Sequence, residues 1–190
     1  LNYSTISDTL GSRLNFFDIG CGKGHYGLML RELSADKFGS YTGLDIYKSE
    51  DFPSEFQHYI SDAADIERYI SDDVNFVISQ SALEHIQEDI HTLKCVTSKL
   101  SSNKDFVQIH MVPAPPSLWL YLWHGWRQYS EKNLSNIAKE VKKINPNLNV
   151  FAVPLAGKSS FFTHLFKITL PFILASLKKR KELSGYGSSS

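Results

Sequence analysis

The sequence predicts an α/β fold in which helices cover both faces of a mostly parallel sheet. Two observations carry this prediction. Short hydrophobic runs alternate with segments of helical periodicity over residues 1–112, an order typical of parallel sheets. The chain has 190 residues, of which 42% are hydrophobic, enough for one domain with a substantial buried core. We therefore expect a single domain over 1–184, followed by a disordered tail over 185–190.

Five hydrophobic runs are expected to form the strands of this sheet. They cover residues 14–19, 41–45, 56–60, 74–78 and 105–112. The first run is stopped by glycines, which mark a turn. Together with the second run and the helical segment between them, it makes one strand–helix–strand crossover unit.

Helices are expected after the first and fourth strands, because apolar residues recur there at helical spacing. The first of these helices carries Tyr26, Met29, Leu30 and Leu33. The stripe of the second consists of Leu83, Ile86, Ile90, Leu93, Thr97 and Leu100. The alternation of strands and amphipathic helices indicates an α/β domain.

The composition changes after residue 112. Three prolines break the chain between 113 and 116, and all three tryptophans fall within 119–126. Residues 113–129 are therefore interpreted as an aromatic-rich lid or insertion. Ser130 is expected to cap a further helix, and residues 149–153 to form a late strand. The apolar positions of that helix are Leu134, Ile137, Ala138, Val141 and Ile144.

Charge and cysteine content argue against several classes of function. Acidic and basic residues balance at 20 each, so nothing indicates a surface built to neutralise a nucleic acid. Cys21 and Cys95 are the only cysteines, too few for a disulfide framework and not spaced as zinc ligands. We expect no metal, no nucleic-acid partner and a reducing, cytoplasmic location.

The apolar run 161–177, followed by basic residues at 178–181, has two interpretations. It contains His164, Lys167 and Pro171 and is marginal in length for a bilayer span. The first interpretation is a helix that closes the domain with a solvated basic end. The second is a peripheral membrane contact of residues 161–181 with an anionic surface.

The most informative segment is the glycine-rich turn after the first strand, residues 18–24, with the sequence Asp-Ile-Gly-Cys-Gly-Lys-Gly. Glycines at alternate positions let the backbone turn tightly and approach a ligand closely. The overlapping residues 22–27 also fit the G-x-G-x-x-G pattern of dinucleotide sites. The loop alone therefore leaves open whether the cofactor is a nicotinamide dinucleotide or another nucleoside.

With its neighbours the loop resembles the first motif of the class I S-adenosylmethionine-dependent methyltransferases, an acidic residue followed by G-x-G-x-G. Asp18, Gly20, Gly22 and Gly24 match that motif position by position, with Cys21 inside the cofactor-binding loop. The resemblance implies that Asp18 helps to hold the methionine part of the cofactor near its ammonium group. It also implies a Rossmann-like three-layer sandwich with a mostly parallel sheet of the seven-stranded type, of whose last two strands only one is recognisable here.

Two further segments match the family in order. Asp45, followed by Ile46, ends the second strand, where a carboxylate accepts hydrogen bonds from both ribose hydroxyls. Because Asp45 lies about 20 residues past the glycine loop, it also suits a dinucleotide and indicates a ribose in either case. The turn after the third strand resembles the adenine-binding turn of the family. The resemblance implies that the Asp62 carboxylate accepts a hydrogen bond from the exocyclic amine of adenine. It also implies that the Ala63 amide donates a hydrogen bond to the adenine ring.

The fourth match is the segment 79–86 after the fourth strand, which contains Leu-Glu-His as in many small-molecule methyltransferases. Gln80 in this segment is expected to contact the cofactor. In a doubly wound sheet, ligands lie beyond the carboxyl ends of the strands where the strand order reverses. We therefore expect the glycine loop and segment 80–85 to face one pocket, although they are about 60 residues apart.

Methyl transfer from a sulfonium needs alignment and exclusion of water more than a nucleophilic side chain. For a hydroxyl acceptor a general base helps, and His85, His110 and His124 are candidates. Glu84 is a further candidate catalytic residue. Two of these residues also have a structural interpretation: capping or packing of the helix start for His85, and a favourable interaction with the helix dipole for Glu84.

The expected function is transfer of a methyl group from S-adenosylmethionine to a small-molecule or glycan acceptor, at oxygen. Aromatic residues within 119–129 suit stacking on a sugar or a flat acceptor, although core packing explains them too. This stretch loosely resembles methyltransferases encoded with surface-polysaccharide enzymes. Two alternatives stay open: an NAD-dependent oxidoreductase, and a partner subunit that binds the cofactor without catalysis. The sequence does not define the oligomeric state.

Overall fold

The computed structural model describes residues 1–102, 105–114 and 127–155. Contacts between residues group the chain into two units, one of residues 1–113 and 125–150, the other of residues 114–124 and 151–190. All described helices and strands belong to the first unit. Most of the second unit lies outside the described residues, so the single domain expected over 1–184 stays a prediction.

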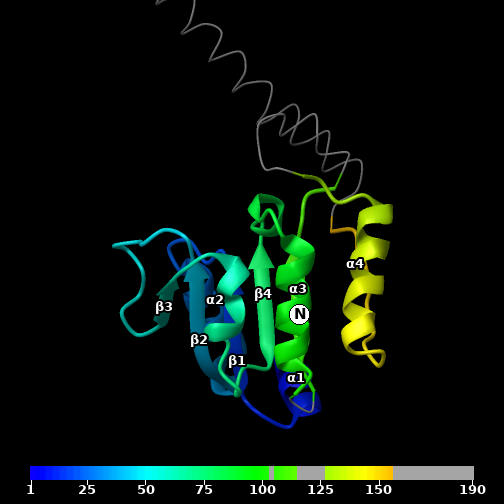
Figure 1. Cartoon of the computed structure of the whole chain (residues 1–190). Coiled ribbons are helices and arrows are strands. Elements are labelled where there is room, and N and C mark those ends of the chain that lie inside the picture. The colour runs from blue at the N-terminus through cyan, green and yellow to red at the C-terminus, as the bar shows by residue number, and fades with distance from the viewer. Residues whose placement is uncertain (103–104, 115–126, 156–190) are drawn as a thin grey trace, which may run out of the picture. The chain divides into compact units, whose positions relative to one another are not determined.

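Strands and helices alternate along the first unit (Figure 1). The helices of eight or more residues are α1 (Tyr3–Leu10), α2 (His25–Ser34), α3 (Asp89–Leu100) and α4 (Glu131–Ile144). The strands are β1 (Leu14–Ile19), β2 (Phe38–Asp45), β3 (Gln57–Ile60), β4 (Phe76–Gln80) and β5 (Val107–Met111). Short 3-10 helices are η1 (Ala35–Lys37), η2 (Ala63–Arg68) and η3 (Leu83–His85).

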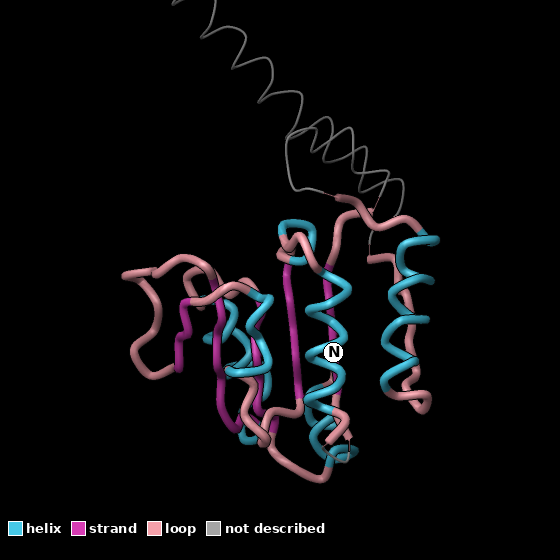
Figure 2. Tube along the Cα trace, in the orientation of Figure 1, coloured by secondary structure: helices cyan, strands magenta, loops and turns pink. Residues whose placement is uncertain are grey.

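The five strands form one parallel sheet in the order β3-β2-β1-β4-β5 (Figure 2). Every neighbouring pair is parallel. The chain winds outward from β1 to β3 and then returns to the other side of β1 with β4. The strand order therefore reverses between β1 and β4, and this switch point is where α/β sheets bind their ligands.

Each face of the sheet has its own hydrophobic core, because the side chains of a strand point alternately to opposite faces. Phe17 and Ile19 of β1 pack on one face with residues of η2 and α3. Phe16 packs on the other face with Leu30 of α2 and Tyr3 of α1. Such coverage on both sides is the reason that the strands read as continuous apolar runs in the sequence. The predicted α/β class and three-layer arrangement are confirmed.

A third cluster joins α3 to α4 beside the sheet, with Leu93 and Val141 at its centre. The Ser130 side chain caps α4 by accepting a hydrogen bond from the Asn133 amide, which confirms the predicted start of this helix. The segment that precedes α4 is closed at its base, where the Tyr129 amide donates to the Pro113 carbonyl at 2.9 Å. Residues 114–128 therefore form an excursion whose two ends meet at the end of β5.

Four expectations about individual elements need correction. Met29 and Leu33 are exposed, at 41% and 56%, because α2 turns Leu30, Gly27 and Ser34 toward the sheet instead. Residues 149–153 are not a strand; Phe151 and Val153 there are largely exposed. The second strand begins at residue 38, three residues earlier than predicted, and the helix after β4 begins only at Asp89, with η3 before it.

Candidate active site

The predicted cofactor-binding segments follow the carboxyl ends of β1, β2, β3 and β4. Because these strands are parallel neighbours, their carboxyl ends share one edge of the sheet. The glycine loop, residues 20–24, lies directly after β1, beside the reversal of strand order. Four segments that are far apart in the sequence are thus placed at one edge by topology alone.

The glycine loop is a tight turn held against β2. Gly20, Gly22 and Gly24 have φ of +73°, +52° and +70°, in the left-handed region that favours glycine. The amides of Gly20 and Cys21 both donate to the Leu44 carbonyl, at 2.8 and 3.2 Å. The thiol of Cys21 is buried against Gly43 of β2, so this residue presents its backbone and not its side chain to the edge.

Asp45 joins the end of β2 to the glycine loop. One carboxylate oxygen accepts from the Gly22 amide at 2.8 Å, and the other accepts from the Tyr47 amide at 3.0 Å. The side chain is half-buried, so one side of the carboxylate faces solvent. A carboxylate fixed in this way retains acceptor capacity for the hydroxyls of a ribose.

Asp18 is a buried carboxyl group at the end of β1, only 2% exposed. The Tyr41 hydroxyl donates to its Oδ2 at 2.5 Å, whereas Oδ1 has no hydrogen-bond partner among the described residues. Burial raises the pKa of Asp18 to about 7; the hydrogen bond from Tyr41 opposes that rise and the charge of Asp45 adds to it. A buried, unpartnered acceptor fits a ligand that supplies a donor, best a positively charged one.

The segment after β4 lies against the glycine loop. A Cβ added at Gly20 would lie 2.4 Å from Cβ of Ala82, so the absence of a side chain at Gly20 lets the two segments touch. Ser81, between Gln80 and Ala82, has φ of +51°, and its amide donates to the Met111 carbonyl at 3.0 Å. The structure therefore brings the glycine loop and the segment 80–85 together, although they are distant in sequence.

We predict that Gly20→Ala lowers the free energy of unfolding by roughly 2–3 kcal/mol, because a left-handed conformation and a clash with Ala82 add together. Gly22→Ala is the matched control. It also has positive φ, but no heavy atom lies within 4 Å of the added Cβ, so a loss of about 1 kcal/mol is expected. Urea denaturation monitored by circular dichroism measures both. Equal losses in the two variants would contradict the contact between Gly20 and Ala82.

The two acid–base candidates of η3 differ in their exposure. Glu84 is 3% exposed, and its Oε2 has no hydrogen-bond partner among the described residues. His85 is exposed, and its amide donates to the Ala82 carbonyl at 2.9 Å. His85 is therefore the candidate that an acceptor reaches without any rearrangement of the buried part of η3.

His110 forms hydrogen bonds inside the protein through both ring nitrogens. Nδ1 lies 2.8 Å from Oγ of Ser79 on the neighbouring strand, and Nε2 lies 3.3 Å from Oε1 of Gln108. Burial lowers the pKa of His110 to about 4, so the ring is neutral near pH 7 and weakly basic. His124 lies outside the described residues.

The predicted adenine-binding turn follows β3. Asp62 is exposed and accepts from the Ala64 amide at 2.8 Å, which caps η2, while Ala63 is buried. Ile46 and Ile60 beside this turn expose 57% and 51% of their surface. They are neighbours at the ends of β2 and β3, since Asp45 pairs with Ile60 in the sheet. Two exposed apolar side chains beside Asp45 suit the face of a purine.

A buried carboxylate at the start of α3 binds Arg127 and Tyr129, the residues that precede α4. Asp89 is 3% exposed and accepts from the Tyr129 hydroxyl at 2.7 Å and from the Arg127 guanidinium. Arg127 also donates to the Gln87 carbonyl at 2.5 Å. Arg127 and Tyr129, at the end of the segment predicted to carry acceptor-binding residues, thus contact residues 87–89 just beyond η3, and residues 115–126 lie outside the described residues.

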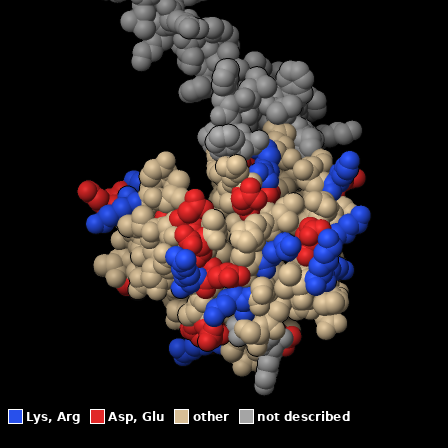
Figure 3. Space-filling model, in the orientation of Figure 1, with Lys and Arg blue, Asp and Glu red and all other residues tan. Residues whose placement is uncertain are grey.

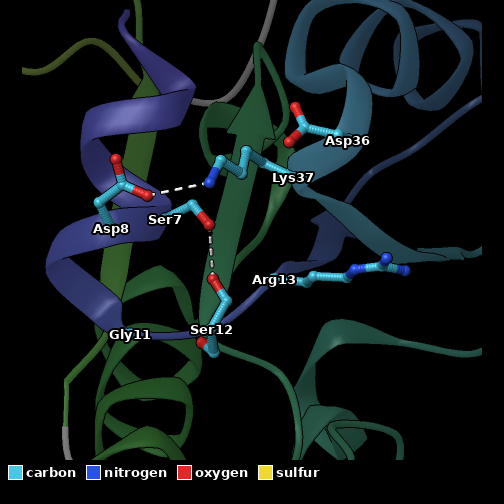
Figure 4. Close-up of a pocket in the computed structure, with 7 residues that line it drawn as sticks. All are labelled: Ser7, Asp8, Gly11, Ser12, Arg13, Asp36 and Lys37. Atoms are coloured by element: carbon cyan, nitrogen blue, oxygen red, sulfur yellow. Dashed lines mark hydrogen bonds and ion pairs between the residues drawn. The ribbon is translucent and has the colours of Figure 1, made fainter.

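A separate hollow of about 400 Å³ lies at the opposite end of the strands, near the start of β1 (Figure 4). Figure 4 shows Asp8 and Lys37 directed toward each other, in an ion pair of 3.0 Å, with Arg13 directed away from them. Ser7 donates to the Ser12 carbonyl at 2.7 Å. Asp8 with Lys37 and Ser7 with Ser12 are thus paired inside this hollow, whereas Asp18 at the other edge has an oxygen with no partner among the described residues.

Sequence reasoning missed two residues of the site. Tyr41 donates to Asp18, and Phe52 packs against Gly24 and Gly43. Tyr41 was interpreted only as part of a buried strand. Because a buried tyrosine hydroxyl usually has a hydrogen-bond partner, it could have indicated a polar group nearby. Phe52 is an isolated aromatic residue in the polar segment 48–54, a pattern that indicates a packed loop.

Neither surface charge nor metal-binding geometry marks a further site among the described residues. Figure 3 shows acidic and basic side chains interspersed on the face in view. Over the described ranges, no group of three or more His, Cys, Asp and Glu residues is placed to hold a metal ion. In the same ranges, no helix has the length and apolar character that a membrane crossing requires. The run 161–181 lies outside them.

Comparisons with known proteins agree with this geometry. A family profile described as a methyltransferase domain matches residues 2–144. The YcgJ protein of Bacillus subtilis is 17% identical over 74% of this chain and 67% of its own, with a TM-score of 0.53. A SAM-dependent methyltransferase of Archaeoglobus fulgidus is 16% identical over 85% and 83%, with a TM-score of 0.49. The small RNA methyltransferase HEN1 is 15% identical over 74% and 21%, with a TM-score of 0.50. No curated protein sequence matches the chain.

The fold is Rossmann-like, with a glycine loop after β1 and a carboxylate at the end of β2 that bind each other through the Gly22 amide. The family profile covers three quarters of the chain, and its description names methyl transfer as the class of reaction. The chain belongs to the methyltransferase domain family.

Proposed function

We propose that the edge formed by the glycine loop, Asp45 and segment 80–85 binds S-adenosylmethionine. The observation that carries this proposal is the hydrogen bond of 2.8 Å from the Gly22 amide to Asp45, beside Oδ1 of Asp18, which has no hydrogen-bond partner among the described residues. Asp18 faces the ammonium group, Asp45 the ribose hydroxyls, and Asp62 with Ala63 the adenine. Gln80, exposed at the end of β4, and Ile46 complete the set of contacts.

Bound S-adenosylmethionine supplies an electrophilic methyl group on a sulfonium. The residues of the chain bind and orient it, since a displacement of this kind depends on alignment and on exclusion of water. We propose His85 as the residue that accepts a proton from a hydroxyl acceptor, because it is exposed on η3 beside the Gly20–Ala82 contact. Both ring nitrogens of His110 form hydrogen bonds inside the protein, so we assign His110 a structural role at the end of the sheet.

We propose a small molecule or a glycan as the acceptor, methylated at oxygen. The apolar and aromatic residues around the 114–128 excursion support an uncharged or flat acceptor. The absence of any net charge is a poor match for a polyanionic acceptor. The two cysteines are both free and buried, which supports a reducing compartment such as the cytoplasm.

Calorimetric titration with S-adenosylhomocysteine and, separately, with NADH tests the cofactor site. We expect heat of binding with the first and none with the second; the opposite result would favour the oxidoreductase. Transfer of labelled methyl groups is then measured with pools of hydroxylated small molecules, oligosaccharides, RNA and protein. Label in the first two pools is the expected result. Label in RNA alone would overturn the proposed acceptor, and cofactor binding without transfer to any pool would favour a non-catalytic partner subunit.

A further inference from the structure

We propose that Phe52 is a positioning residue that clamps the glycine loop from the β2–β3 connection. The role goes beyond the cofactor contacts above, because Phe52 acts on the loop and not on the cofactor. Two glycines, Gly24 and Gly43, leave the space that the Phe52 ring occupies. A Cβ added at Gly24 would lie 2.6 Å from Cε2 of Phe52, and one added at Gly43 would lie 3.1 Å from the same atom. The edge of the ring therefore fills a slot between the loop and β2.

The two glycines have different reasons for lacking a side chain. Gly24 has φ of +70°, so its backbone already favours glycine. Gly43 lies within the regular strand β2, where no positive φ occurs, and a Cβ there would lie 2.6 Å from Sγ of Cys21 as well as near Phe52. Packing alone therefore explains why residue 43 is a glycine. The strand is thus shaped to admit two side chains, one from the glycine loop and one from the connection.

The ring of Phe52 is backed by His58 of β3. The two rings are stacked, with centroids 4.1 Å apart and an angle of 11° between their planes. Position 58 pairs with Gly43 in the sheet, so the ring that backs Phe52 is fixed by the strand register. Nε2 of His58 is buried without a hydrogen-bond partner among the described residues, and burial lowers its pKa, so the neutral ring is favoured against Phe52.

A second contact joins the same two segments. Nζ of Lys23 lies 2.6 Å from Oδ2 of Asp51, and these residues are the sequence neighbours of Gly24 and Phe52. Both side chains are exposed, so this ion pair adds little by itself. Its position shows that the connection and the loop run against each other over two consecutive residues. With the Asp45–Gly22 hydrogen bond, the glycine loop is held from β2 and from the β2–β3 connection at once.

The clamp holds the loop in one conformation before the cofactor arrives. A loop that is ordered in advance loses less conformational freedom on binding, and affinity rises accordingly. Without the ring, Gly24 regains the broad freedom of glycine. The expected signature of Phe52→Ala is therefore a local loosening of residues 20–27 together with weaker binding, while the rest of the sheet is unchanged.

Amide hydrogen exchange of the unliganded protein, read by mass spectrometry, tests the clamp without any ligand. We expect the peptide covering 20–27 to exchange about tenfold faster in Phe52→Ala, and the peptide covering β4 to be unchanged. Phe52→Leu, which keeps apolar atoms in the slot, should restore protection to within about threefold of the wild type. Tyr69→Ala is the matched control, a half-buried aromatic that packs 4.9 Å from Tyr59 on β3 and away from the loop.

Calorimetry with S-adenosylhomocysteine gives the second readout, which rests on the proposed cofactor site. We expect the Kd to rise about tenfold in Phe52→Ala and to stay near the wild-type value in Phe52→Leu and Tyr69→Ala. Unchanged exchange of 20–27 in Phe52→Ala, or equal effects in Phe52→Ala and Tyr69→Ala, would overturn the clamp. A wild-type protein that does not bind S-adenosylhomocysteine would overturn the cofactor site instead, while the exchange result would still decide the role of Phe52.

Discussion

Replacement of Asp45 by alanine is expected to raise the Kd for S-adenosylhomocysteine by about 100-fold or more. Hydrogen bonds to a charged group contribute roughly 1.5–3 kcal/mol each, and two ribose hydroxyls lose theirs together. The Gly22 amide also loses its acceptor at 2.8 Å, so the glycine loop is affected from the same side. Isothermal titration calorimetry of the folded variant measures the change.

Two further variants sharpen the interpretation of Asp45. Asp65→Ala removes an exposed carboxylate of η2, one whose ion pair with Arg68 is 3.4 Å long, and it should bind like the wild type. Asp45→Asn keeps one carbonyl acceptor and should fall between wild type and Asp45→Ala. If Asp45→Ala binds within about threefold of the wild type, Asp45 does not hold the ribose and the proposed cofactor site is wrong.

Cofactor affinity is expected to depend on pH through Asp18. In the unliganded protein, burial raises the pKa of this carboxyl from 3.8 to about 7, so below pH 7 it is mostly protonated. An ammonium group binds the carboxylate form, and binding must then release the proton. The Kd for S-adenosylhomocysteine should therefore fall about tenfold for each unit of pH between 5.5 and 7 and level off above that range.

The variant Asp18→Asn removes the titrating group and provides the control. It should bind more weakly than the wild type at pH 8 and show a nearly flat pH profile. Titrations at several pH values, in buffers that differ in ionisation enthalpy, report both the affinity and the released proton. A wild-type Kd that does not change from pH 5.5 to 8, or the same slope in Asp18→Asn, would contradict the role of Asp18.

The same pKa shift affects the stability of the unliganded protein. Because the folded pKa lies above the unfolded value, the folded state binds more protons between pH 4 and pH 7. Stability contributed by the protonated group is present at low pH and is lost as the pH rises through that window. A difference of about three pKa units corresponds to a loss on the order of 4 kcal/mol. Urea denaturation should show this fall in the wild type and not in Asp18→Asn.

The parts of the fold that depend on local pattern could be predicted from the sequence. The first strand and the capped start of α4 have the predicted bounds, because glycines stop one and Ser130 begins the other. The carboxyl ends of parallel strands share an edge, so the hydrogen bond between Asp45 and Gly22 agrees with the placement expected from the glycine spacing. Each of these features is encoded within a few residues.

The features that depend on contacts between distant residues could not be predicted in the same way. An apolar position on a helix does not indicate which side meets the sheet, so Met29 and Leu33 were placed on the wrong face of α2. Residues 149–153 are rich in β-branched and aromatic residues, as strands are, but no neighbouring strand pairs with them within the described ranges. The slot for Phe52 arises from two glycines 19 residues apart, and only the folded sheet brings them together.

The hydrogen bond between the Tyr129 amide and the Pro113 carbonyl has a consequence for how this enzyme can change. A loop whose ends are already joined can be exchanged or lengthened at small entropic cost and without strain on the strands below it. We expect that grafting a different segment in place of residues 114–126, with Arg127 kept as the partner of Asp89, would leave methyl-donor binding intact and alter only the choice of acceptor. Substrate range and donor affinity would then evolve as separate traits of one chain.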